Sequence, residues 1–255
     1  MATVRRVVAP NPGPYTGPGT NTWVLGDDPI KVVIDPGPND DGHLAGIQRA
    51  LGGAVLGAVL VTHSHADHLE LAERLAAGDR ARVARFPELA DGDVVRIGNL
   101  NLTALHTPGH APDHLAFWMA EDRVLFSGDL VLGRGSSMVT YPEGDVAAYL
   151  RSLERVAELE PRLLFPGHWD PVTDPLAKIA EYREHRLARE RQIMDEVQER
   201  PGSAEDLTRR VYVREVGESE PLLRAAEMTL RAHLRKLVDE GRVTEEDGRY
   251  EVTAG

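Results

Sequence analysis

The chain has 255 residues, no cysteine and a formal net charge of −12 at pH 7, with 29 Lys and Arg against 41 Asp and Glu. The absence of cysteine excludes disulfides, cysteine nucleophiles and thiolate ligands, so a metal site in this chain must use nitrogen and oxygen ligands. The acidic balance disfavours a protein that coats nucleic acid without sequence preference, and no apolar stretch approaches the roughly 18 residues of a membrane span, so we expect a cytoplasmic protein without membrane partners.

The first part of the chain is predicted to alternate strands with loops and helices. Residues 1–20 are rich in Gly and Pro and are expected to be loop, whereas the apolar runs at 22–25 and 31–34 are typical of strands. The continuous apolar run at 58–62 predicts a strand covered on both faces, and residues 69–77 are expected to continue as a helix. A loop rich in histidine therefore separates a buried strand from a helix.

The same arrangement recurs at three later strands. Strand-like runs at 101–105, 124–126 and 163–165 each end in a polar cluster, and these clusters contain His110, Asp129 and His168 in that order. Side chains that can bind a metal therefore gather at the ends of separate strands.

The C-terminal part predicts helices followed by a short hairpin. A long charged helix is expected from residue 175 until Pro201-Gly202 ends it. Helical patterns at 204–211 and 222–240 precede two short strands, which is the order of a winged helix. We therefore predict three parts: a catalytic domain at 1–174, a linking helix at 175–200 and a winged-helix-like domain at 201–255.

The motif His63-Ser64-His65-Ala66-Asp67-His68 places four side chains that can bind metal within six residues. His63 and His65 can converge on one ion, whereas Asp67 and His68, at the start of the next helix, can face a second ion. The alternative is a polar loop whose histidines are merely solvated, but the density of the motif favours a metal site.

The downstream clusters supply the remaining ligands. His110 would give the first ion a third nitrogen, His168 would give the second ion another nitrogen, and Asp129 would bridge both ions. Taken singly, each of these three residues could be an ordinary loop residue. Together with the motif they complete two coordination spheres and leave a position for water between the ions.

In this order, His-x-His-x-Asp-His followed by His110, Asp129 and His168 resembles the metallo-β-lactamase superfamily over residues 20 to about 172. The resemblance implies an α/β fold, an αββα sandwich of two packed sheets flanked by helices, with two metal ions at one edge. It also implies that Asp35, in the segment 33–37, orients the ligand loop, although a simple turn aspartate before Pro-Gly explains it equally well.

The expected cofactor is two Zn²⁺ per chain, with iron or manganese as alternatives. The absence of cysteine excludes the lactamases that use a thiolate, Asp129 argues against true lactamases, and His65 stands where flavodiiron proteins carry a glutamate. The expected reaction is hydrolysis, in which a hydroxide shared by the two ions is the nucleophile and Asp67 orients it or accepts its proton.

Two further features have weaker signals. His114 is a candidate catalytic residue that donates a proton to the leaving group or contacts a phosphate, and the alternative is a histidine that opens the strand at 115–118 and bonds locally. The segment 133–137 could line the site or be a loop without a catalytic role. His43, His106, His185 and His233 are expected to be surface or structural residues.

The substrate is open between two classes. The segment 220–241 makes the chain resemble the branch that contains the mitochondrial lactamase-beta-like endoribonuclease, which implies cleavage of single-stranded RNA, with Arg231, Arg235 and Lys236 as a basic face. Residues 200–255 nevertheless carry 10 Lys and Arg against 12 Asp and Glu. The alternative is an ester or thioester hydrolase of the glyoxalase II type, on an anionic or acyl small molecule. A binding module with structural metals is a third hypothesis, and a homo-oligomer remains open.

Overall fold

The structure is a computed structural model that describes residues 2–27 and 29–253. The chain divides into two compact units that interleave along the sequence. The first unit comprises Met1–Pro108, Asp113–Ser137 and Ser152–Ile179, and the second comprises Gly109–Pro112, Met138–Arg151 and Ala180–Gly255. Because the units interleave, the three-part division at residues 174 and 200 stays a prediction.

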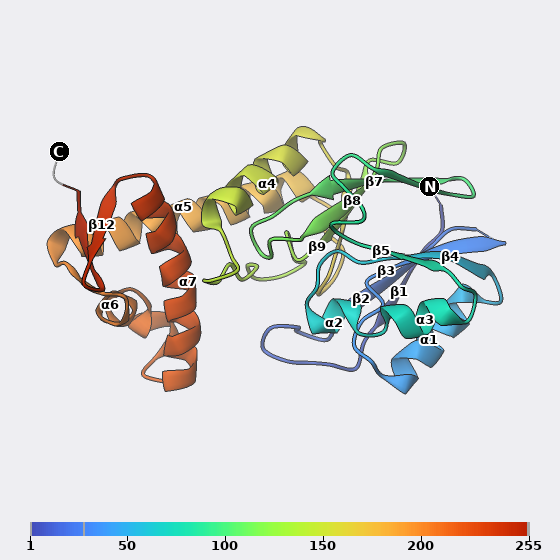
Figure 1. The fold of residues 1–255 in the computed structure, drawn as a ribbon, viewed down its shortest axis with the longest axis horizontal. Coiled ribbons are helices and arrows are strands. Elements are labelled where there is room, and N and C mark those ends of the chain that lie inside the picture. The colour runs from blue at the N-terminus through green and yellow to red at the C-terminus, as the bar shows by residue number, and fades with distance from the viewer. Residues whose placement is uncertain (1, 28, 254–255) are drawn as a thin grey trace. The chain divides into compact units, whose positions relative to one another are not determined.

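The first sheet of unit one has the strand order β1-β2-β3-β4-β5 (Figure 1). Its strands are β1 Val4–Val8, β2 Asn21–Leu25, β3 Ile30–Ile34, β4 Val55–Leu60 and β5 Arg82–Ala84. The first three strands pair antiparallel, and β3, β4 and β5 pair parallel. Three helices accompany this sheet: α1 Asp41–Leu51, α2 Ala66–Leu69 and α3 Ala72–Ala77.

The second sheet has the order β10-β9-β8-β7-β6 and is antiparallel except for the parallel pair β9 and β10. Its strands are β6 Val94–Ile97, β7 Leu100–His106, β8 Leu115–Met119, β9 Val124–Gly128 and β10 Leu163–Pro166. Helix α4 comprises Val146–Glu158. The second half of this helix packs against the second sheet, where Arg155 donates a hydrogen bond to the carbonyl of His106 in β7.

The two sheets face each other because alternate residues of each strand point to opposite faces. In β2, Trp23 and Leu25 join the apolar core that also contains Phe117 and Phe126 of the second sheet, whereas Val24 joins the layer under α1 and α3. Helices thus cover the outer face of the first sheet, as Figure 1 shows. The predicted αββα sandwich is confirmed.

The second unit contains the C-terminal winged helix that the sequence predicts. Its elements are α5 Pro175–Glu199, β11 Gly202–Ser203, α6 Ala204–Val216, α7 Glu220–Asp239, β12 Val243–Glu246 and β13 Arg249–Val252. The three strands form a small sheet of order β11-β13-β12, and Leu207, Leu230 and Tyr250 contribute to one apolar core. Among the described residues, no helix is both long and apolar enough to cross a membrane.

Two local predictions were wrong. Residues 4–8, expected to be loop, form strand β1, because its half-exposed side chains give no apolar pattern and its conformation comes from pairing with β2. The helix expected at 69–77 is two helices, α2 and α3, and α2 begins earlier, directly after His65. Asp67 and His68 therefore lie at the start of a helix, as the sequence predicts.

Candidate metal centre

The seven side chains predicted as ligands lie in loops that follow strand ends or on the short helix after one of these loops. His63 comes three residues after β4, Asp129 comes directly after β9, and His168 comes two residues after β10. The short helix α2 carries Asp67 and His68. These strands end in loops that bring their polar residues together.

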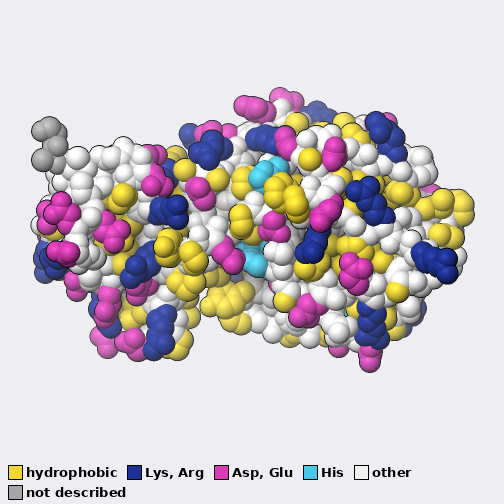
Figure 2. All heavy atoms as spheres, viewed as in Figure 1, with side chains coloured by type: hydrophobic (Ala, Val, Ile, Leu, Met, Phe, Trp, Pro, Cys, Tyr) yellow, Lys and Arg dark blue, Asp and Glu magenta, His cyan; other side chains and the backbone are white. Residues whose placement is uncertain are grey.

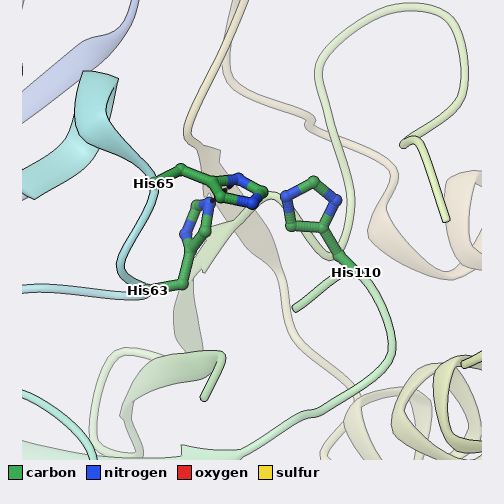
Figure 3. Close-up of side chains that lie close together, drawn as sticks. All are labelled: His63, His65 and His110. Atoms are coloured by element: carbon green, nitrogen blue, oxygen red, sulfur yellow. Dashed lines mark hydrogen bonds between the residues drawn. The ribbon is translucent and has the colours of Figure 1, made fainter. Parts of the chain in front are cut away.

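The ligand atoms fall into three overlapping groups, each with all atoms within 4.8 Å of one another. The groups are His63, His65 and His110; His63, His68 and Asp129; and Asp67, His68 and His168. Figure 3 shows the imidazoles of the first group turned toward one another. The structure therefore brings together all seven side chains, and Asp129 lies in the group that connects the other two.

The spacing of the donors fits a metal ion. His68 is fully buried, and its Nε2 has no hydrogen-bond partner among the described residues. This nitrogen lies 3.5 Å from Asp67 Oδ2 and 3.6 Å from Asp129 Oδ1, and His168 Nε2 lies 3.5 Å and 3.4 Å from Asp67 Oδ2 and Asp129 Oδ2. Two ligands bound at about 2.1 Å to one tetrahedral zinc ion lie about 3.4 Å apart. The residues present therefore fit a bound divalent cation.

Carboxylates dominate the electrostatics of the site. Burial alone lowers the pKa of His68, but the carboxylates of Asp129, Asp35 and Asp67 outweigh burial and raise that pKa to about 10. For His168, burial again lowers the pKa and Asp129 raises it, with a net increase. The site therefore has the negative field that a divalent cation neutralises.

Asp35 orients two of the histidines. Its carboxylate accepts hydrogen bonds from the backbone N–H of Thr62 at 2.7 Å, from Thr62 Oγ1 at 2.8 Å and from His68 Nδ1 at 2.9 Å. Because the Thr62 hydroxyl has only one hydrogen, it must accept from His63 Nδ1, which lies 3.0 Å away. Both imidazoles therefore have a hydrogen on Nδ1, which turns Nε2 toward the other ligand atoms; His63 Nε2 lies 2.9 Å from His65 Nδ1.

Backbone carbonyls orient two more histidines. His168 Nδ1 donates to the carbonyl of Gly19 at 3.3 Å, and His110 Nδ1 donates to the carbonyl of Met138 at 2.7 Å. Thr20 Oγ1 donates to Asp67 Oδ2 at 2.9 Å. These partners were not predictable from the sequence, because a carbonyl has no residue-specific signal and residues 1–20 show no regular apolar pattern.

His114 is buried and bonds to the backbone of one of the candidate ligands. It is fully buried, its Nε2 accepts the backbone N–H of Asp129 at 3.1 Å, and its Nδ1 therefore donates to Thr107 Oγ1 at 2.9 Å. This geometry favours the local-bonding alternative over proton donation to a leaving group. The histidine fixes the backbone of Asp129.

The segment 133–137 also has structural contacts. Ser137 Oγ donates to the carbonyl of Asp129 at 2.5 Å, and a side chain at Gly133 would meet the carbonyl of Asp170 at 2.1 Å. Arg134 is exposed. This segment therefore supports the backbone of Asp129.

The sequence profile described as Metallo-beta-lactamase superfamily matches residues 15–91 and 81–168. The chain belongs to this superfamily. The matched ranges contain all seven ligand candidates, and the fold is the αββα sandwich of this family of hydrolases. A second profile, the Beta-lactamase associated winged helix domain, matches residues 203–250 of this superfamily member.

Relatives resemble this metallo-beta-lactamase superfamily member over most of its length. It is 33% identical to the Beta-lactamase-like protein 2 homolog of Drosophila melanogaster over an alignment of 272 positions, which covers 95% of this chain and 90% of the relative. It is 35% identical to the Atrochrysone carboxyl ACP thioesterase of Aspergillus chevalieri over an alignment of 215 positions, which covers 77% of this chain and 66% of the relative. The crystal structure of a Beta-lactamase domain protein from Burkholderia ambifaria is 27% identical, with a TM-score of 0.85 over 98% of this chain and 91% of that one.

Proposed function

We propose that this superfamily hydrolase uses two metal ions to hydrolyse an acyl thioester. The observation that carries the metal site is the cluster of seven ligand side chains, in which oxygen acceptors bind Nδ1 of four histidines and so orient Nε2 toward the other ligand atoms. The thioester is supported by the relative named as a thioesterase and by the acidic charge of the chain.

The seven residues divide naturally between two ions. His63, His65 and His110 would hold one ion, Asp67, His68 and His168 would hold the other, and Asp129 would contact both. Imidazole and carboxylate donors suit zinc, and they also suit iron and manganese, so zinc is our proposal for the identity of the metal. When bound, such ions lower the pKa of water and polarise the carbonyl that is attacked.

Asp67 is suited to proton transfer. Its side chain is 28% exposed, compared with 11% for Asp129 and 2% for Asp35. Because Thr20 already bonds to Oδ2, Oδ1 is the oxygen that would accept the proton as water adds to the acyl carbon. The carbon–sulfur bond then breaks, and the departing thiolate takes up the proton that Asp67 accepted, which returns Asp67 to its carboxylate form. Asp35 and the carbonyls of Gly19 and Met138 hold the imidazoles during this step.

Cleavage of single-stranded RNA is the second candidate, favoured by the winged-helix module. The three cations of its predicted basic face are neutralised in the structure: Arg231 pairs with Glu227 at 2.7 Å, Arg235 pairs with Asp239 at 3.7 Å, and Lys236 pairs with Glu190 at 2.6 Å. On the face drawn in Figure 2, Lys and Arg side chains are interspersed with Asp and Glu. This charge pattern favours the thioester over a long polyanion.

Parallel assays test the proposal. Purified protein is analysed for bound metal and then given an acyl-coenzyme A thioester and a short single-stranded oligoribonucleotide. We expect hydrolysis of the thioester that a chelator abolishes and added zinc restores. Cleavage of RNA without thioester turnover would select the nuclease, and bound metal without either activity would select the binding module.

A further inference from the structure

The short segment that carries His110 belongs to the same compact unit as the winged helix. This second unit joins Gly109–Pro112 and Met138–Arg151 to Ala180–Gly255, although both short segments are far from the C-terminus in sequence. Because His110 belongs to this unit, we expect residues of the second unit to orient its imidazole.

The contacts at His110 bear this out. The carbonyl of Met138 accepts the Nδ1 hydrogen of His110 at 2.7 Å, and the N–H of Asp145 donates to the carbonyl of Gly109 at 2.9 Å. The first bond fixes the tautomer and the rotation of the imidazole, and the second fixes the backbone that precedes it. The segment 138–145 therefore orients this ligand.

A close approach at Gly109 adds to this support. Its φ is +139°, and a Cβ there would lie 2.4–2.5 Å from the Cα, Cβ and N atoms of Tyr149. Tyr149 is fully buried, and the guanidinium of Arg186 in α5 lies 5.3 Å from the centre of its ring. The backbone at residue 109 is thus pressed against α4, which in turn contacts α5.

The same segment is attached to α7 at its other end. The N–H of Tyr141 donates to the carbonyl of Met228, in the middle of α7, at 3.0 Å, and the N–H of Gly144 donates to the carbonyl of Thr140 at 2.6 Å, which closes a turn. Only two residues separate Tyr141 from Met138. Two hydrogen bonds, joined by the backbone of residues 138–141, therefore connect α7 to the imidazole of His110.

We infer that the winged-helix module holds the metal ligand His110 in place through the segment 138–149. The module then helps to position this ligand, through the carbonyl of Met138, the backbone N–H of residue 141 and the close packing at Gly109. The inference rests on the proposed function in one respect only, the role of His110 as a ligand. It assigns the appended module a task that requires no nucleic acid.

A matched pair of substitutions at Tyr141 tests the contact with α7. Tyr141→Pro removes the N–H that Met228 accepts, whereas Tyr141→Ala removes the half-exposed ring and keeps the N–H. The zinc-free variants are titrated with zinc ions in competition with a chelator, and His110→Ala identifies which binding step belongs to the first ion. We expect Tyr141→Pro to bind that zinc at least about tenfold more weakly and the other zinc normally. Tyr141→Ala should match the wild type.

A second pair tests the contact at Gly109. Gly109→Ala should weaken the same zinc site, because its Cβ pushes residue 109 away from Tyr149. Gly217→Ala is the control, since Gly217 also has a positive φ, of +66°, but a Cβ there would meet no atom within 4 Å. Circular dichroism checks that each variant is folded.

The outcomes separate the inference from the proposed function. Wild-type affinity for both zinc ions in folded Tyr141→Pro and Gly109→Ala would overturn the inference, and so would equal weakening of both sites. A wild-type protein that binds no zinc would instead refute the proposed function. In that case nitrogen NMR of the zinc-free protein still tests the inference: His110 should be protonated at Nδ1 in the wild type, and a mixture of tautomers should appear in Tyr141→Pro.

Discussion

Asp129 is held by three different contacts. His114 accepts its backbone N–H, Ser137 donates to its carbonyl, and its carboxylate lies between His68 and His168. The site thus depends on a backbone position as much as on a side chain. Such an arrangement limits the movement of the one carboxylate that would contact both ions.

Substitution of the two carboxylates of the ligand set should remove the activity. Asp67→Asn should lower kcat by about 10²–10⁴, because the amide cannot accept the proton of the attacking water. Asp129→Ala should abolish zinc-dependent turnover. Zinc content and thioester hydrolysis check both variants, and near-normal activity in either one would contradict the assignment.

His114 should behave as a positioning residue. His114→Leu leaves the buried N–H of Asp129 without its acceptor, which should cost about 1–3 kcal/mol of the free energy of unfolding and lower kcat. His114→Gln supplies a replacement oxygen and should recover part of both losses. The pH profile of kcat/KM for the Gln variant should keep both limbs; loss of the alkaline limb would reinstate His114 as the proton donor.

His233 should make the protein sensitive to acid. Burial first, then the positive charges of Arg186, Arg189 and Lys236, lower its pKa from 6.5 to about 3. Between these values the unfolded chain binds a proton that the folded chain does not. Stability should therefore fall as the pH falls below about 6.5, by up to about 1.4 kcal/mol per pH unit. Urea unfolding at several pH values measures this dependence. The free energy of unfolding should change less with pH in His233→Leu than in the wild type.

At the scale of single residues, the candidate ligands were predictable from the sequence but their hydrogen-bond partners were not. A dense histidine motif is visible in a sequence because several metal-competent residues are adjacent. Thr20 and Thr62 have no such signal, since a threonine beside a strand is common, and the carbonyls of Gly19 and Met138 belong to no residue type. The roles of these groups depend on which loops meet in space.

At the scale of elements, strands and helices with strong apolar patterns were predictable. β4 and α5 lie close to the predicted runs, because burial on both faces or a long helical period leaves a clear signal. The strands β1, β5 and β6 lie at sheet edges and were not predicted. An edge strand is partly exposed, so its conformation depends on its neighbour more than on its own pattern.

The helix caps of the second unit provide a test at this scale. Ser203 and Asp206 form a capping box at the start of α6, whereas Ser219 precedes α7 without a capping hydrogen bond from its side chain. Ser203→Ala should therefore lower the free energy of unfolding by about 0.5–2 kcal/mol. Ser219→Ala is the matched control and should change it by no more than a few tenths, as measured by thermal unfolding. Equal effects would contradict this account of the caps.

At the scale of the whole molecule, metal binding should contribute to stability. Without a cation, the carboxylates of Asp35, Asp67 and Asp129 are close together around buried imidazoles. Zinc at 1,000 times its dissociation constant should add about 4 kcal/mol to the free energy of unfolding if it binds only the folded chain. Melting curves with and without a chelator should differ accordingly, and identical curves would argue against a metal site.

The chain passes between its two compact units five times, at residues 108, 112, 137, 151 and 179. No single cut therefore separates them, and a chimera that exchanges only residues 201–255 with a relative would leave Gly109–Pro112 and Met138–Arg151 beside a foreign surface. To replace the C-terminal module with a different one, the segments 109–112 and 138–151 must be exchanged together with it. For the same reason, homologous chains that differ in residues 201–255 should also differ, by insertions or deletions, in the segments 109–112 and 138–151.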